Sequence, residues 1–219
     1  MSTISYAITA STEVEELPKL LSLLENSIRE EDEIVLQLDK DNTDPLLRSL
    51  VKADFPTIKT ITFPLNKHFG NFKNNLKDHC KKDYIFQIDA DELPNEELIK
   101  LLPEILATYP DCGLFHVPRV NTVEGVTTRH LQEWNWTVNE QGWVNWPDWQ
   151  PRLFKNLPEI EWDLPVHETI INFKTAAFFP ESEEYCLYHA KSITKQESQN
   201  KFYSLLDHKR EGYVWWSQK

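Results

Sequence analysis

The stretch that decides the fold is YIFQIDADE, at residues 84–92. Residues 84–88 are apolar or uncharged and are typical of a buried β-strand. Asp89 and Asp91 follow this strand directly, which places two carboxylates at the carboxyl edge of a sheet, where α/β proteins bind ligands. Carboxylate oxygens in that position could hold a hard divalent cation.

The spacing of these two aspartates is weak evidence when it is taken alone. Asp39 and Asp41 form a second pair with the same spacing, and the chain is rich in acidic residues. The alternative interpretation of residues 89–92 is a solvated turn that caps a helix starting near Asn95. The value of the motif therefore depends on the rest of the chain.

Strand and helix patterns alternate on both sides of this stretch. Further strands are expected at residues 4–8, 34–38, 58–63 and 114–120. Helices are expected near residues 12–28, 95–108 and 192–209, with a short helix that starts at Pro45 and another marked by Phe69, Phe72 and Leu76. Thr12 and Glu15 would form a capping box for the first helix, although Pro18 favours a later start. Residues 123–126 are expected to form a hairpin turn. Alternation of this kind predicts an α/β fold with a parallel sheet and helices on both faces.

The overall charge limits the classes of partner. The 219 residues carry a formal net charge of −12, so nucleic acid is not expected to bind, because phosphate binding depends on Lys and Arg. An anionic nucleotide substrate is also disfavoured unless something local reverses the field. A divalent cation held by carboxylates would do so.

The N-terminal sequence MSTISYAITA lacks the basic start and apolar core of a signal peptide, and no transmembrane segment is expected. The chain has three cysteines, an odd number without CxxC spacing. This excludes a zinc motif and a disulfide framework, and buried free thiols are expected. We therefore predict a cytoplasmic protein that forms a single domain over residues 1–219.

Several stretches together resemble glycosyltransferase family 2. They are residues 71–76 (NFKNNL), 82–92 (KDYIFQIDADE), 39–44 (DKDNTD) and 4–16. Residues 150–155 (QPRLFK), Trp162 and Val166-His167-Glu168 are similar to a subgroup that includes lipopolysaccharide-core transferases. Lys40, Asp41 and Lys82 depart from the small residues that are usual in this family, which leaves the choice of donor open.

The resemblance implies a GT-A fold, which is Rossmann-like with a mixed, mostly parallel central sheet. It also implies inverting transfer of a sugar, as by a hexosyltransferase, from a nucleotide-sugar donor to a glycan or other hydroxyl acceptor. A UDP-sugar is favoured because uracil is the usual base in this family, and Asp39 would contact that base. Residues 1–120 would bind the donor and residues 121–219 the acceptor.

The resemblance also implies roles for particular residues. The nucleotide-sugar would be bound by Thr9, Ala10, Glu13, Asp39, Asn74, Asp89, Ala90, Asp91 and Lys195. A Mn²⁺ or Mg²⁺ ion would be held by Asp89, Asp91 and His189, and it would neutralise the charge that develops on the leaving diphosphate. A histidine that is satisfied at a strand end is the alternative for His189. Lys191 and Lys195 could contact the diphosphate or lie at a solvated helix start.

The acceptor hydroxyl must lose its proton to a carboxylate. By analogy with this role, Glu168 is the first candidate for the base and Asp148 the second, although His167 and Glu168 could instead anchor a turn. The acceptor would be bound by Trp146, Trp149, Arg152 and His167. Aromatic faces suit sugars, and Trp134, Trp136 and Trp143 could also contact the acceptor. Six of the eight tryptophans lie between residues 134 and 162, and we expect two or three of them to serve the core. Arg129 is expected to pair at the surface.

Two other functions are weaker candidates. A nucleotidyltransferase would typically need a glycine-rich loop near the first strand, and no glycine precedes Gly70. A non-catalytic carbohydrate-binding protein would fit the tryptophan cluster, and it predicts glycan binding without hydrolysis of a donor.

Overall fold

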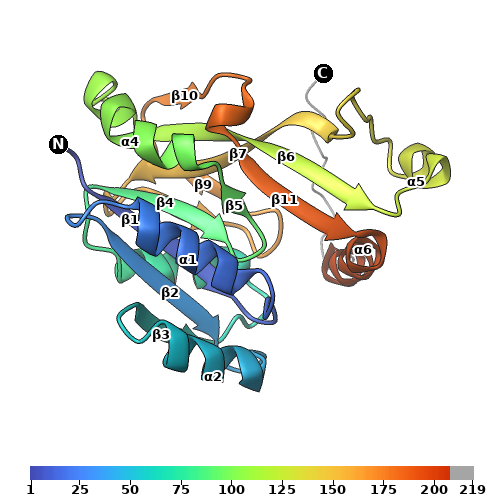
Figure 1. Cartoon of the computed structure of the whole chain (residues 1–219), viewed down its shortest axis with the longest axis horizontal. Coiled ribbons are helices and arrows are strands. Elements are labelled where there is room, and N and C mark those ends of the chain that lie inside the picture. The colour runs from blue at the N-terminus through green and yellow to red at the C-terminus, as the bar shows by residue number, and fades with distance from the viewer. Residues whose placement is uncertain (208–219) are drawn as a thin grey trace.

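The computed structural model describes residues 1–207, with side chains up to residue 202. Its central sheet has the strand order β3-β2-β1-β4-β7-β6-β11-β5, and β10 also pairs with β6. The first four strands are β1 (Ile4–Ala10), β2 (Glu33–Asp39), β3 (Lys59–Phe63) and β4 (Tyr84–Asp89). They run parallel to one another, as the sequence predicted (Figure 1).

Helices cover both faces of these strands. Buried residues of α1 (Leu17–Ser27), α2 (Pro45–Asp54) and α4 (Glu96–Thr108) belong to one core cluster. On the opposite face lies α3 (Phe69–Asp78), with the two-stranded sheet of β8 (Glu161–Asp163) and β9 (Thr169–Ile171). The strand order reverses between β1 and β4, and a crevice for ligands forms at such a switch point.

The second half of the chain extends the same sheet. Strand β7 (Val144–Lys155) is antiparallel to both β4 and β6 (Leu114–Glu124). Strands β11 (Leu187–Ser192) and β10 (Ala176–Phe178) run parallel to β6, and β5 (Leu93–Pro94) is antiparallel to β11. The result is the mixed, mostly parallel sheet that was predicted, built from both halves of the chain.

Two α-helices of the described residues belong to this half, one short and one long. Helix α5 (Thr128–Glu133) lies between β6 and β7, and α6 (Ile193–Asp207) follows β11. The predicted end of the last helix, near residue 209, lies outside the described residues.

The capping box predicted at Thr12 and Glu15 was wrong. Helix α1 begins at Leu17, with Pro18 in its first turn, which is the alternative start. The reason is that the carboxylate of Glu13 accepts hydrogen bonds from two preceding backbone N–H groups, one of them that of Thr12, at 2.9 Å. These bonds hold a turn before the helix, at the carboxyl end of β1.

The hairpin turn predicted at residues 123–126 was also wrong in part. The chain does turn there, and Gly125 has a positive φ of 81°. However, the turn leads into α5, and β7 begins only at Val144. The strands β6 and β7 are therefore neighbours that a long excursion joins.

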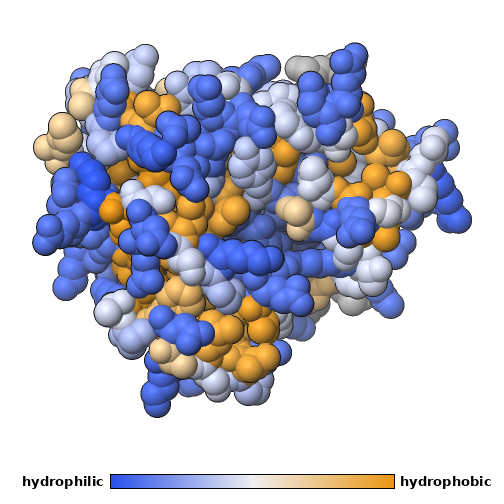
Figure 2. Space-filling model, viewed as in Figure 1, coloured by the Kyte–Doolittle hydropathy of each residue, from blue (hydrophilic) through white to orange (hydrophobic). Residues whose placement is uncertain are grey.

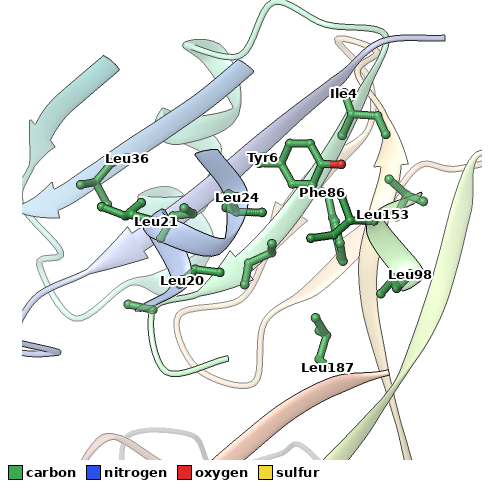
Figure 3. Close-up of a cluster of buried hydrophobic side chains, with 14 of the residues drawn as sticks. Ile4, Tyr6, Leu20, Leu21, Leu24, Leu36, Phe86, Leu98, Leu153 and Leu187 are labelled. Carbon is green, nitrogen blue, oxygen red and sulfur yellow. The ribbon is translucent and has the colours of Figure 1, made fainter. Parts of the chain in front are cut away.

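Large apolar side chains fill the interior between the sheet and α1 and α4 (Figure 3). Leu20 and Leu21 of α1 are fully buried, and the rings of Tyr6 and Phe86 lie 5.9 Å apart on adjacent strands. The three cysteines are free and buried, as predicted. Burial of this apolar surface is the main force that holds the layers together.

Hydrophilic residues cover most of the face shown in Figure 2, and the hydrophobic ones form separate patches. One patch lies over α2, where Leu46 is 61% exposed. Within residues 1–207, no helix has the length and apolar character that a membrane span requires.

Candidate active site

A cavity of about 800 Å³ opens at the carboxyl ends of β1 and β4, where the strand order reverses. Its size suits a small-molecule ligand. Residues of β6, β7, β11, α3 and α6 complete its walls. Thirteen of the sixteen predicted site residues line it: Thr9, Ala10, Glu13, Asp39, Asp89, Ala90, Asp91, Asp148, Arg152, His167, Glu168, His189 and Lys195.

The structure does not bring the other three predicted residues to the cavity. Both polar atoms of the Asn74 amide bond the backbone of Trp162 at 2.8 Å, so this side chain fixes β8 against α3. Trp149 packs against the core on the other face of β7, because side chains alternate along a strand. Trp146 packs edge-on against Trp143, with ring centroids 4.9 Å apart.

One wall of the cavity, where the sequence predicted a donor site, is formed by the ends of β1 and β2. Asp39 is 2% exposed, and its carboxylate accepts hydrogen bonds from the backbone N–H groups of Asp41 and Leu65 and from the side chain of Asn42. These bonds fix the loop after β2 beside Thr9 and its neighbours. Four of the predicted nucleotide-binding residues, Thr9, Ala10, Glu13 and Asp39, therefore line the cavity together.

Asp89, at the end of β4, is paired with two cations. Arg152 Nη2 lies 2.7 Å from Asp89 Oδ2, and Lys73 Nζ lies 3.2 Å from Asp89 Oδ1. Burial raises the pKa of Asp89, but the positive charges of Arg152 and Lys73 outweigh burial and hold the pKa well below its usual range. Asp89 is therefore ionised at neutral pH.

Lys73 links Asp89 to the first candidate for the base. Its Nζ lies 2.7 Å from Glu168 Oε1, and its side chain is only 2% exposed. Lys73 Nζ also lies 4.7 Å from the centre of the Trp162 ring, a cation–π contact. Burial raises the pKa of Glu168, but the charge of Lys73 outweighs burial and lowers the pKa below its ordinary value. Glu168 is thus an ionised carboxylate that faces the cavity.

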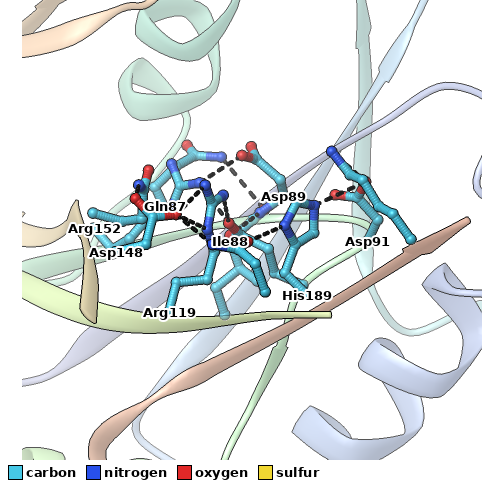
Figure 4. A network of polar contacts seen from close by, with 12 residues as sticks. Gln87, Ile88, Asp89, Asp91, Arg119, Asp148, Arg152 and His189 are labelled. Carbon is cyan, nitrogen blue, oxygen red and sulfur yellow. Dashed lines mark hydrogen bonds and ion pairs between the residues drawn. The ribbon is translucent and has the colours of Figure 1, made fainter. Parts of the chain in front are cut away.

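Two arginines and two carboxylates form a second network beside this pair (Figure 4). Arg152 and Arg119 both bond Glu92 Oε1, at 2.7 and 2.8 Å. Arg119 also donates two hydrogen bonds to Asp148 Oδ2, at 2.9 and 2.6 Å. The remaining donors to Asp148 are the side chains of Asn121 and Gln150. Asp148 therefore has both oxygens engaged, whereas Glu168 has one side-chain partner among the described residues.

Asp91 lies among three basic side chains. Its Oδ2 is 3.4 Å from His189 Nε2, 3.4 Å from Lys195 Nζ and 3.9 Å from Lys191 Nζ. Burial raises the pKa of Asp91, but these neighbours, with His189 first, hold the pKa far below its usual range. Burial lowers the pKa of His189, whose Nδ1 lies 2.7 Å from Asn121 Oδ1.

The arrangement of these side chains bears on the predicted Mn²⁺ or Mg²⁺ ion. Within residues 1–207, no group of three His, Cys, Asp or Glu side chains is placed to hold a metal ion. Asp89 is committed to Lys73 and Arg152, and Asp91 faces two lysines. The side chains predicted to bind the ion are therefore not arranged to hold it. A bound Mn²⁺ or Mg²⁺ ion stays a prediction.

Several residues that line the cavity had no role predicted from the sequence. Lys73 was missed although it lies three residues before the buried Leu76, so it faces the sheet while Asn74 does not. Arg119 was missed within the apolar strand β6, where an arginine signals a buried ionic partner. Trp136, which was only one of several possible acceptor contacts, also lines the cavity.

Predictions for Arg129 and for the clustered tryptophans are confirmed. Arg129 is 81% exposed and pairs with Glu133 at 2.7 Å, so surface pairing is confirmed. Trp162 is buried and Trp149 packs against the core, which confirms that two of the six clustered tryptophans serve the core.

Comparison with known proteins identifies the fold. The model of the family described as Glycosyl transferase family 2 matches residues 5–177. The crystal structure of S. aureus TarS 1–349 is similar with a TM-score of 0.55 and 13% identity, and the match covers 94% of this chain and 63% of that one. This likeness supports the predicted GT-A fold.

Complexes of TarS 1–349 match less of the chain. The complex with UDP has a TM-score of 0.43 and 17% identity, covering 59% of this chain and 37% of that one. The complex with UDP-GlcNAc has a TM-score of 0.40 and 18% identity, covering 59% and 36%. The chain thus spans less than two thirds of these structures. The search of curated proteins found no match.

Proposed function

Because the chain belongs to glycosyl transferase family 2, we propose that it moves a sugar from a nucleotide-sugar donor to a hydroxyl of a glycan acceptor, with inversion. The observation that carries this proposal is that the ionised carboxylate of Glu168 and the predicted donor wall face the same cavity. TarS has been crystallised with UDP and with UDP-GlcNAc, and we propose a UDP-sugar as the donor here.

Glu168 is the proposed base. Inversion needs a single displacement, in which the acceptor oxygen bonds to the anomeric carbon while the bond from that carbon to the diphosphate oxygen breaks. The electron pair leaves with the nucleoside diphosphate, and the acceptor proton passes to Glu168. Asp148 is less suited to this role, because it already accepts four hydrogen bonds, three at Oδ2 from Arg119 and Asn121 and one at Oδ1 from Gln150.

Lys73 and Arg152 have positioning roles in this proposal. Lys73 holds Glu168 ionised and fixes its direction, and Arg152 fixes Asp89 at the end of β4. We propose that Thr9, Glu13 and Asp39 line the nucleotide subsite. Bound Mn²⁺ or Mg²⁺ would neutralise a leaving diphosphate.

The first test is calorimetry with UDP, with and without Mn²⁺, together with an assay of UDP-sugar hydrolysis, since transferases commonly leak donor to water. We expect UDP to bind and the donor to be hydrolysed slowly. Glycan binding without any hydrolysis of nucleotide-sugars would instead support a non-catalytic carbohydrate-binding protein.

The second test concerns the base. In Glu168→Gln we expect hydrolysis and transfer to fall by about 10²–10⁴-fold, the usual contribution of a general base, while UDP affinity is kept. Asp148→Asn should bind UDP and lose less activity. The exposed Glu159→Gln, which makes the same change outside the cavity, is the matched control. Activity that survives in Glu168→Gln but not in Asp148→Asn would reassign the base.

A further inference from the structure

We infer that Lys191 and Lys195 bind the donor diphosphate and supply the positive charge that a divalent cation would otherwise provide. This inference rests on the proposed function and names the groups that hold the leaving group. It concerns two residues of the cavity wall, at the end of β11 and in the first turn of α6.

The cations of the cavity are unevenly paired with carboxylates. Lys73 lies between Asp89 and Glu168, Arg152 between Asp89 and Glu92, and Arg119 between Glu92 and Asp148. These three cations share four carboxylates, so they have no positive charge to spare for a ligand, whereas Lys191 and Lys195 share only Asp91 and Glu16 among the described residues. Lys191 and Lys195 are the other two lysines on the described part of the cavity wall.

Lys191 is buried without a hydrogen-bonded carboxylate. Its side chain is 6% exposed, yet the nearest carboxylate oxygen, Asp91 Oδ2, lies 3.9 Å from Nζ, which is beyond hydrogen-bond distance. The short contact of Nζ is with a neutral amide, Gln199 Oε1, at 2.6 Å. A buried ammonium group without a hydrogen-bonded counter-ion is costly. An anion that enters the cavity would supply the missing partner.

Asp91 brings the two lysines together. His189 and Lys191 are two residues apart on β11, so both side chains point to the same face, toward Asp91. Lys195 follows four residues later, and its Nζ lies 3.4 Å from Asp91 Oδ2. The same Nζ forms an ion pair with Glu16 Oε1 at 3.1 Å. Asp91 thereby holds both ammonium groups beside the carboxyl end of β4, on the donor side of the cavity.

The net charge of −12 repels an anionic substrate. The two lysines would offset this repulsion locally. When the bond between the sugar and the diphosphate breaks, negative charge grows on the departing phosphate oxygen. Preorganised positive charge at that position stabilises the transition state. The two lysines can give this stabilisation without a metal ion, and Asp91 then orients them.

The test measures UDP affinity by calorimetry in excess EDTA for the wild type, Lys191→Met, Lys195→Met and the double variant. We expect the wild type to bind without metal, each single change to weaken UDP binding about tenfold, and the double change about a hundredfold, the usual effect of lost charged hydrogen bonds. Affinity should also fall as salt rises, because salt screens the lysine charges.

Two controls separate the possible outcomes. Lys100→Met removes one positive charge at a 55% exposed position of α4 and should bind UDP like the wild type. Uridine has no phosphate, so ligand-observed NMR should find its binding unchanged in every correctly folded variant.

UDP binding that requires Mn²⁺ and is the same in the lysine variants as in Lys100→Met would overturn the inference and leave the proposed function intact. Absence of UDP binding by the wild type under both conditions would instead refute the proposed function itself.

Discussion

Lys73→Met is the substitution that most directly tests how the site is held together. Methionine keeps the length and apolar contacts of the lysine stem but removes its charge. Asp89 and Glu168 would lose ion pairs of 3.2 and 2.7 Å, and the Trp162 ring would lose its cation–π partner. The change leaves Glu168 half-buried and without the one cation that pairs with it among the described residues.

The expected loss of stability follows from burial. Breaking a fully buried ion pair costs about 3–5 kcal/mol. Here the carboxylates retain 31% and 18% of their exposure and Arg152 still neutralises Asp89, so we expect a loss of about 2 kcal/mol. For a chain of this size, that lowers the melting temperature by about 4–8 °C.

The same substitution should change the pH dependence of activity. Lys73 is the main cause that lowers the pKa of Glu168, and burial acts in the opposite direction. Without Lys73, the pKa of Glu168 rises, so the base is protonated at a higher pH. The acid limb of the kcat/KM profile for transfer should therefore move to higher pH.

The measurements are thermal unfolding and a pH–rate profile, with Lys77→Met as the control. Lys77 lies one turn further along α3, is also buried, and does not line the cavity. A Lys73→Met protein that melts with the wild type and keeps its acid limb would refute the coupling of Lys73 to Glu168.

Three more predictions concern other parts of the cavity. In Gly70→Ala, the new Cβ would lie 2.7 Å from the backbone oxygen of Leu164, so the segment that carries Glu168 must move. Unfolding experiments should show a loss of stability of about 1–3 kcal/mol, and kinetics should show a lower kcat. The folded-state pKa of Asp91 is depressed, so the stability that its charge contributes is present above about pH 4 and is lost as the pH falls; Asp91→Asn should flatten the decline of the urea midpoint in this range. Trp136→Ala should raise the acceptor KM about tenfold through lost aromatic contact and leave UDP affinity unchanged, and an unchanged acceptor KM would remove Trp136 from the acceptor subsite.

Much of the fold was predictable because the information is local. Strands β1, β2 and β4 are almost wholly buried, so they appear in the sequence as short apolar runs with polar ends. The start of α1 was not predictable from the capping pattern, because Glu13 rather than Glu15 bonds the preceding backbone.

The candidate site was less predictable, because its partners come from distant strands. The sequence placed Asp89 and Asp91 correctly at the carboxyl edge of the sheet, yet nothing local indicates that Lys73, Arg152 and Lys191 surround them. Those pairings depend on the order in which β7, β6 and β11 join the sheet. The position of Trp149 was not predictable for a similar reason. Which face of the sheet its side chain lies on depends on how β7 is aligned in the sheet.

The strand order also constrains how a nascent chain can mature on the ribosome. Strands β1 to β4 can pair as soon as they emerge, but the free edge of β4 has no neighbour until β7 has been made. Lys191 and Lys195 emerge later still, after β10. A chain that stalls before β11 would thus carry the nucleotide wall without these two lysines, and its open β4 or β6 edge would be exposed to aggregation until translation resumes.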